Sequence, residues 1–193
     1  MKRKVYLILT LLFVLGFGST SAQTAALIPP QLAGIFEAPG FITSAGQTSD
    51  AAIVKVLVNT RLKLNFGYDI AAKPQAVSGA KTLVLVLGAS NKGLGAAGLS
   101  IEQETERVKA VLALAKSEHM RIIAMHTGGT ARRGESSNAI IALCVPYADV
   151  AIVVEGGNND GFFTDLCAKE KVPLVMVPSI AEAGNVLKGL MAK

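Results

Sequence analysis

The chain has 193 residues, of which 51% are hydrophobic, enough for one domain with a full core, and it contains no tryptophan. It carries 19 Lys and Arg against 14 Asp and Glu, but three of the basic residues are Lys2, Arg3 and Lys4. Without these three, the formal net charge falls from +5 to +2, and no dense basic stripe with interleaved aromatic residues remains. Composition and charge therefore argue against nucleic-acid binding.

Residues 1–22 have the pattern of a secretion signal. The basic start is followed by a 13-residue apolar run, Val5–Phe17, and by the small-residue cleavage signal Thr20-Ser21-Ala22. A membrane-spanning helix needs about 20 apolar residues, so the run is short for an anchor, although an uncleaved membrane anchor is the alternative. No cysteine follows the run to carry a lipid. We predict an exported protein of the periplasm or extracellular space, cut after Ala22.

The rest of the chain divides into a loose N-terminal segment, 23–39, marked by Pro29, Pro30 and Pro39, and an α/β domain over 40–193. In the domain, apolar runs typical of strands alternate with amphipathic patterns typical of helices. The runs predict strands at 41–44, 62–68, 82–88, 122–125, 150–154 and 174–177.

Helix signals lie between these runs. Thr48 or Ser49 is expected to cap a helix whose buried stripe includes Ile53, and Ser100 with Gln103 forms a capping box that opens a second helix. A further helix follows each of the last three strands. Cys144 and Cys167 lie on the apolar stripes of two separate helices, so we expect two buried free thiols rather than a disulfide.

Alternating strands and helices predict right-handed crossovers and a parallel sheet covered on both faces. The run 82–88 is almost continuous Leu and Val, as expected for a central strand, whereas 62–68 alternates like a half-exposed edge strand. We therefore predict a single doubly wound sheet with strand order 2-1-3-4-5-6, a flavodoxin-like or Rossmann-like three-layer α/β fold. In such folds ligands bind at the carboxyl ends of the strands, where the first and third strands diverge.

Four of the predicted strands end in loops rich in glycine, hydroxyl, amide and charged residues. These loops supply the candidate ligand-binding residues: Ser44, Gln47, Thr48, Ser49, Ser90, Asn91, Lys92, His126, Arg132, Arg133, Glu155 and Asn158. Lys92 offers a point charge to a carboxylate or phosphate, and Arg132 with Arg133 offers a two-pronged clamp. Ordinary solvated loop charges and simple helix caps are the alternatives. The pattern predicts a site for a small anion.

His126 is the candidate catalytic residue, because a histidine at the carboxyl end of a buried strand can act as an acid, a base or a hydrogen-bond donor to an anion. A packed histidine satisfied by the backbone is the alternative. No metal site is predicted, since His119, the other histidine, is placed at the opposite end of the sheet.

No cofactor is assigned from motifs. Residues 93–98 match G-x-G-x-x-G, but four residues separate Gly93 from the strand end at Gly88, and the next helix is expected to start only after Ser100. A flexible glycine-rich lid is the simpler interpretation. The crevice loops contain no aromatic residue to stack on a flavin, and the usual catalytic motifs of hydrolases and nucleotide-binding enzymes are absent.

Three stretches together carry a resemblance: Thr43-Ser44-Ala45-Gly46-Gln47, the glycine-rich run at 88–98, and Met-His-Thr-Gly-Gly-Thr-Ala-Arg-Arg-Gly at 125–134. As a set they resemble an exported bacterial domain family of unknown function over about residues 40–185. The resemblance implies the fold and the location, and it brings no activity with it.

Three functions are left open. The first is an envelope domain that binds a small anion, with a transporter as a possible partner. The second is a hydrolase or transferase that uses His126 with Lys92 or Arg132. The third is a partner-binding or structural module, because a fold does not fix a function.

Overall fold

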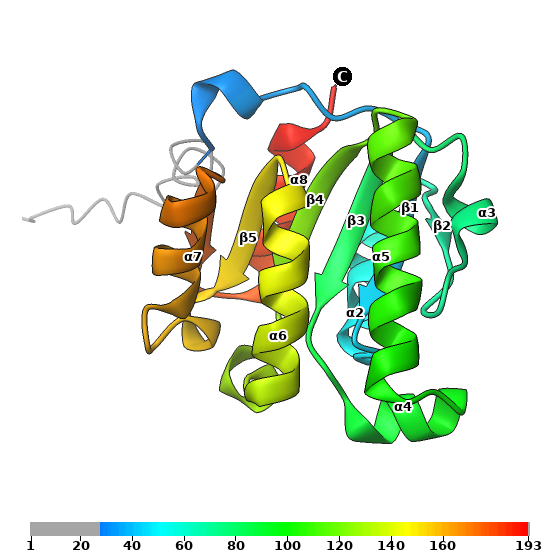
Figure 1. Cartoon of the computed structure of the whole chain (residues 1–193). Helices are drawn as coiled ribbons and strands as arrows, with labels where there is room; N and C mark the ends of the chain where they lie inside the picture. Colours follow the sequence, from blue (N-terminus) through cyan, green and yellow to red (C-terminus); the bar gives the residue numbers. More distant parts are fainter. Residues whose placement is uncertain (1–27, 193) are drawn as a thin grey trace, which may run out of the picture.

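The computed structural model describes residues 28–192, and its centre is a six-stranded parallel sheet between two layers of helices (Figure 1). The strands are β1 (Gly40–Ala45), β2 (Gly67–Tyr68), β3 (Thr82–Leu87), β4 (Arg121–His126), β5 (Val150–Val154) and β6 (Leu174–Val177). Their order is β2-β1-β3-β4-β5-β6 and every neighbouring pair is parallel. The predicted α/β fold and strand order are confirmed.

Helices cover both faces of the sheet. The helices α5 (Ile101–Ser117), α6 (Glu135–Cys144) and α7 (Phe162–Glu170) lie on the front face in Figure 1, and α2 (Asp50–Lys55) and α8 (Ile180–Leu190) lie behind it. Each face has its own hydrophobic core, because alternate residues of the central strands point to opposite sides. Leu83, Leu85 and Leu87 of β3 pack in front, while Val84 and Val86 pack behind.

The predicted second strand is much shorter than expected. A π-helix, η2 (Val56–Arg61), continues α2, and β2 pairs with β1 only through Gly67 and Tyr68. The side chain of Asn59 holds both the N–H and the C=O of Phe66 at 2.8 Å, so the chain before β2 is tied to the helix instead of the sheet. Ile53 also departs from its predicted buried position and is 47% exposed, since Ala51 and Val54 face the core in its place.

The glycine-rich segment after β3 is a helix and not a lid. The capping box of α5 is confirmed, with Ser100 and Gln103 bonded in both directions, but an additional helix, α4 (Asn91–Ala97), precedes it. The Ser90 hydroxyl accepts a hydrogen bond from the N–H of Gly93 at 3.1 Å and starts α4, and Gly98, with φ +65°, ends it. Gly93 and Gly95 therefore lie inside a helix, where they cannot form the phosphate-binding turn of a dinucleotide site.

Residues 28–36, expected to be loose, pack on the back core. Ile28, Leu32 and Phe36 are buried in the same cluster as α8, and Phe36 forms a parallel bridge with Met191. The predicted secretion signal lies outside the described residues. Within residues 28–192, no helix is long and apolar enough to span a bilayer.

Both cysteines are free and buried, as predicted. Cys144 ends α6 and Cys167 lies in α7. Burial raises the pKa of the Cys167 thiol to about 11 and raises the pKa of Cys144 further. Neither thiol is therefore poised to react.

The remaining elements are short connections. They are the helix α3 (Pro74–Val77) and the 3-10 turns η1 (Pro30–Leu32), η3 (Gly129–Arg132), η4 (Val145–Tyr147) and η5 (Glu155–Gly157). Two of these turns, η3 and η4, contribute residues to the cavities described below.

Candidate functional site

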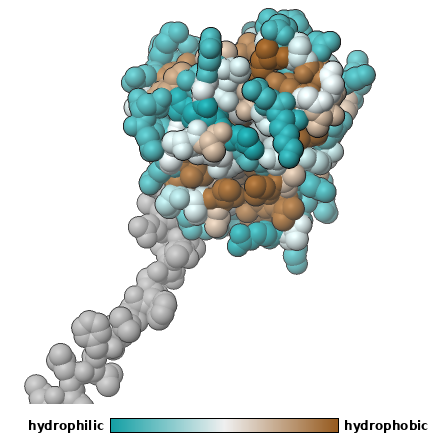
Figure 2. Space-filling model, turned by 90° about the horizontal axis from the view of Figure 1, so that it is seen from below, coloured by the Kyte–Doolittle hydropathy of each residue, from teal (hydrophilic) through white to brown (hydrophobic). Residues whose placement is uncertain are grey.

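A polar cleft of about 400 Å³ lies at the carboxyl-terminal edge of the sheet, between the loop after β3 and the connection from β4 to α6. Its lining residues are Ala89, Ser90, Asn91, Lys92, Ala131, Arg132, Arg133, Gly134, Glu135, Ser136 and Ser137. Figure 2 looks onto this edge, where hydrophilic side chains form a broad central region and hydrophobic side chains form a band below it. We call this cavity the carboxyl-edge cleft.

Lys92 forms one wall of the cleft. It is the second residue of α4, so the Ser90 cap that starts this helix also fixes the lysine backbone. Its side chain is exposed, and within residues 28–192 it makes no ion pair or hydrogen bond. Lys92 therefore contributes a positive charge to the cleft that no ion pair within residues 28–192 neutralises.

Arg132 forms the opposite wall and is only loosely held. One Nη donates to the Ser49 hydroxyl at 3.2 Å, and Nε lies 3.6 Å from Asp50 Oδ2, beyond hydrogen-bond distance. Asp50 Oδ2 itself is buried and has no hydrogen-bond partner in the described part of the chain. Gly128 allows this arrangement, because a Cβ there would overlap both Arg132 and Asp50. Arg132 thus keeps free donors for a ligand.

Unlike Arg132, Arg133 makes several hydrogen bonds within the protein. Its guanidinium donates to Asn138, to both oxygens of Asp160 and to the backbone carbonyl of Gly157, and it lies 4.5 Å from the centre of the Phe162 ring. These bonds hold the pKa of the Asp160 carboxyl below its usual value. Arg133 reaches the cleft but mainly fastens the β5–α7 loop to α6.

The start of α6 supplies the back of the cleft. Its N-cap is Gly134, with φ +138°, which has no side chain to accept from the first backbone N–H groups. Ser137 turns inward, where its hydroxyl accepts from the N–H of Ala89 at 2.9 Å and joins the two walls. Glu135 also lines the cleft, and its negative charge opposes that of Lys92.

His126 lies outside the lining of the cleft. Its side chain is fully buried, with Nδ1 3.0 Å from the carbonyl oxygen of Leu87 and Nε2 3.1 Å from that of Gly129. The ring packs on Phe163 at a centroid distance of 5.1 Å. Burial lowers the pKa of His126. Neither ring nitrogen is directed at the cleft, so the packed-histidine alternative describes the observed geometry.

The crevice expected between the first and third strands is filled. Ser44, Gln47 and Thr48 are buried, and each bonds inside the β1–α2 loop or to its neighbours. Backbone segments close over them, because a Cβ on Gly46 would overlap Gly88 and a Cβ on Gly93 would overlap Gln47. Ser49 alone of this group is exposed, where it meets Arg132. We call this packed region the β1–α2 corner.

A buried ion pair that the sequence analysis missed holds this corner together. The Glu104 carboxylate is fully buried and accepts from the N–H of Gly46 at 2.8 Å, from Gln47 at 2.9 Å, and from Arg107 at 2.7 and 2.8 Å. Arg107 also donates to the carbonyl oxygens of Ser44 and Ala72. The available signal was spacing: Glu104 falls on the apolar stripe of α5, three residues after Ile101.

The last two predicted residues follow β5. Asn158 serves as a cap, since its Oδ1 accepts from the N–H groups of Phe163 and Thr164 at 2.8 and 3.3 Å. Glu155 is exposed in the turn η5. Neither residue lines the carboxyl-edge cleft. In the region from residue 28 to 192, no three His, Cys, Asp or Glu side chains gather closely enough to hold a metal ion.

The fold and the cleft define a doubly wound α/β domain with a polar pocket at the carboxyl ends of its strands. The chain belongs to the family described as a domain of unknown function (DUF6305), which matches residues 37–191. This match confirms membership of a domain family of unknown function over residues 37–191, whereas export and a bacterial origin stay predictions. No curated protein matches the chain.

Proposed function

We propose that the protein is an exported domain of the cell envelope that binds a small anion, such as a phosphate group, in the carboxyl-edge cleft. The observation that carries the proposal is the convergence of Lys92, Arg132 and the uncapped start of α6 on one cavity. Lys92 has no partner within residues 28–192, and Arg132, although ion-paired with Asp50 and bonded to Ser49, keeps guanidinium N–H groups without a hydrogen-bond partner there. Free N–H groups at a helix start add donors and a partial positive charge.

The size of the cleft supports a small ligand. Its volume of about 400 Å³ is at the lower end of the range for small-molecule sites. A point-charge lysine and a planar guanidinium on opposite walls suit a compact anion that can accept from both sides. Glu135 at the rim favours one small anion over a ligand with many negative charges.

Calorimetric titration with inorganic phosphate tests the binding step. Lys92→Gln and Arg132→Gln should each weaken binding roughly tenfold to a hundredfold, because a hydrogen bond to a charged group contributes about 1.5–3 kcal/mol. Lys188→Gln, which removes an exposed lysine from α8, is the matched control and should bind like the wild type. Equal binding by all four proteins, or none by the wild type, would contradict the proposal.

Export is supported by the pattern of residues 1–22, a basic start, an apolar run and a small-residue cleavage signal. The mature protein is expected to begin at Gln23. Intact mass measurement of protein recovered from its native host distinguishes cleavage after Ala22 from retention of residues 1–22, because the retained segment would add its mass. An envelope transporter that takes up or delivers the anion is the partner that this proposal implies.

The enzyme alternative is less well supported by the geometry. Both ring nitrogens of His126 face main-chain carbonyl oxygens, and the histidine does not line the cleft that contains Lys92 and Arg132. The binding domain is therefore preferred to a hydrolase or transferase that relies on this histidine.

A further inference from the structure

We propose a second ligand site, at the opposite edge of the sheet, that takes a small organic monocarboxylate with an aromatic ring. It is a cavity of about 670 Å³, and we call it the amino-edge pocket. Its lining residues are Lys116, His119, Met120, Arg121, Ile122, Pro146, Tyr147 and Asp149. These residues end α5, begin β4 and precede β5, which separates the pocket from the carboxyl-edge cleft by the length of the sheet.

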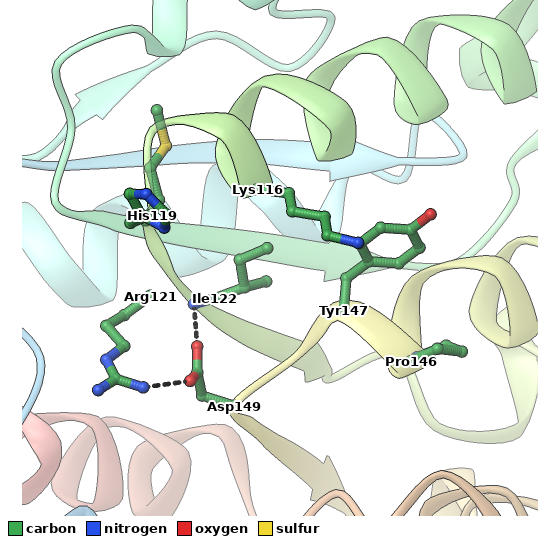
Figure 3. A pocket seen from close by; sticks show the side chains of 8 residues that line it. Lys116, His119, Arg121, Ile122, Pro146, Tyr147 and Asp149 are labelled. Carbon is green, nitrogen blue, oxygen red and sulfur yellow. Dashed lines mark hydrogen bonds and ion pairs between the residues drawn. The ribbon is translucent and has the colours of Figure 1, made fainter.

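One side of the pocket carries the Arg121 guanidinium, whose orientation is partly fixed by Asp149. Asp149 accepts from the backbone N–H of Ile122 at 2.8 Å and from Nη1 of Arg121 at 2.6 Å (Figure 3). The first bond fixes the carboxylate, and the fixed carboxylate orients the guanidinium. Nε and Nη2 of Arg121 have no partner in the described part of the chain. They remain as donors for a ligand carboxylate.

Lys116 adds a second positive charge to the same pocket. It lies in the last turn of α5, is exposed, and forms no ion pair within residues 28–192. Lys81, Lys109 and Lys169 are paired with carboxylates, whereas Lys116, like several other lysines of the described surface, is not. Lys116 therefore has an unused charge at the pocket, as Lys92 has at the cleft.

His119 has a left-handed backbone conformation, in which glycine is the least strained residue. Its φ is +55°, and the following N–H, from Met120, bonds back to the carbonyl oxygen of Ala115 at 2.9 Å, which ends α5 in a left-handed turn. A side chain in this conformation is disfavoured, although histidine tolerates it better than most residues. The turn places the imidazole on one side of the pocket, with Pro146 and Tyr147 on the other (Figure 3).

Tyr147 and Pro146 provide the apolar side. Tyr147 is 42% exposed, one of the few large apolar side chains that the described surface leaves uncovered, and Pro146 is exposed beside it. Buried Met120 and Ile122 form further apolar lining. An aromatic ring that stacks on Tyr147 would cover this surface. The stacking contributes more binding free energy than the buried area alone would provide.

The charge balance selects a monocarboxylate rather than a phosphate. Lys116 and Arg121 contribute two positive charges, Asp149 removes one, and the carbonyl end of α5 contributes roughly half a negative charge. The remaining positive charge is small, so electrostatics alone cannot hold a multiply charged anion. A ring must supply the rest of the affinity. This requirement distinguishes the amino-edge pocket from the carboxyl-edge cleft.

A titration of the protein with 2-naphthoate, followed by ¹H–¹⁵N NMR, tests the site. Saturable shifts are expected at the amides of His119–Ile122 and Tyr147. Lys116→Gln should weaken binding roughly fivefold and Tyr147→Ser about tenfold, in keeping with an exposed charge and a lost ring contact. Lys109→Gln, on the same helix and away from the pocket, is the matched control and should change nothing.

The amide spectrum of each variant also reports whether its fold is intact. Shifts confined to the amides around Lys92 and Ser136 would overturn the proposal, because they would place the ligand in the carboxyl-edge cleft. Absence of saturation, or equal binding by Lys116→Gln, Tyr147→Ser and Lys109→Gln, would also overturn it. None of these results bears on whether inorganic phosphate binds the cleft, so the two proposals fail separately.

Discussion

The β1–α2 corner and the carboxyl-edge cleft are built from the same kinds of residue, yet one is closed and the other open. In the corner, Gln47 and Glu104 are buried and bonded to each other and to their surroundings. In the cleft, Lys92 has no partner in the described chain and Arg132 keeps free donors. A polar side chain at the end of a strand therefore marks a ligand site only when its polar atoms are not already used internally.

The largest expected effect comes from breaking the corner. Glu104→Ala leaves the Arg107 guanidinium buried without its carboxylate and frees two donors, so the free energy of unfolding should fall by about 3–5 kcal/mol. Urea unfolding measures the loss. Glu106→Ala, which removes an exposed carboxylate two residues along the same helix, is the control and should cost under about 0.5 kcal/mol. Similar losses for both variants would show that the buried pair does not hold the corner.

Two glycines in α4 test how closely the β1–α2 corner packs against this helix. Gly93→Ala should destabilise the protein by about 1–3 kcal/mol, because its Cβ would overlap the backbone oxygen of Gln47 and push the corner away from α4. Gly95→Ala meets nothing nearby and should stabilise the same helix by about 0.5–1 kcal/mol. Thermal unfolding of the two variants separates these effects. A change in stability of the same sign for both variants would mean that the corner is not in close contact with α4.

A smaller effect concerns the pH dependence of stability. Burial holds the pKa of His126 below its ordinary value of about 6.5, so the unfolded chain binds a proton at a higher pH than the folded chain does. Stability from this source is fully present above about pH 6.5 and decreases as the pH falls toward the lowered folded value. Urea unfolding over this window should give a flatter profile for His126→Gln than for the wild type. Parallel profiles would contradict the lowered pKa of His126.

Strand order and one helix start followed from local patterns. The unbroken apolar run of β3 predicted a central strand, because burial on two faces leaves a direct mark on sequence. The alternation over 62–68 indicated the correct edge position, although only Gly67 and Tyr68 of that stretch form the strand. The Ser100 and Gln103 capping box is equally local and equally visible. The glycine-rich helix α4 was not visible, since glycine lowers helix propensity and the Ser90 cap and tertiary contacts outweigh it.

The site was harder to predict than the fold. The sequence placed Lys92 and Arg132 at neighbouring strand ends, and the structure brings them to one cleft. It gave no indication that Gly46 and Gly93 would permit the close backbone contacts that fill the expected crevice. It also left Glu104 and Arg107 unnoticed, because their partners are backbone groups 35–63 residues away in the chain. The position of Glu104 on the apolar stripe of α5 was the one local signal for this pair.

The central claim is that the cleft is open to an anion while the corner is closed. A titration with inorganic phosphate, followed by ¹H–¹⁵N NMR, tests it most directly. Saturable shifts are expected at the amides of Lys92, Ser136 and Ser137, with little change at Gly46 and Gln47. Shifts that centre on Gly46 and Gln47 would contradict it, because they would place the anion in the β1–α2 corner.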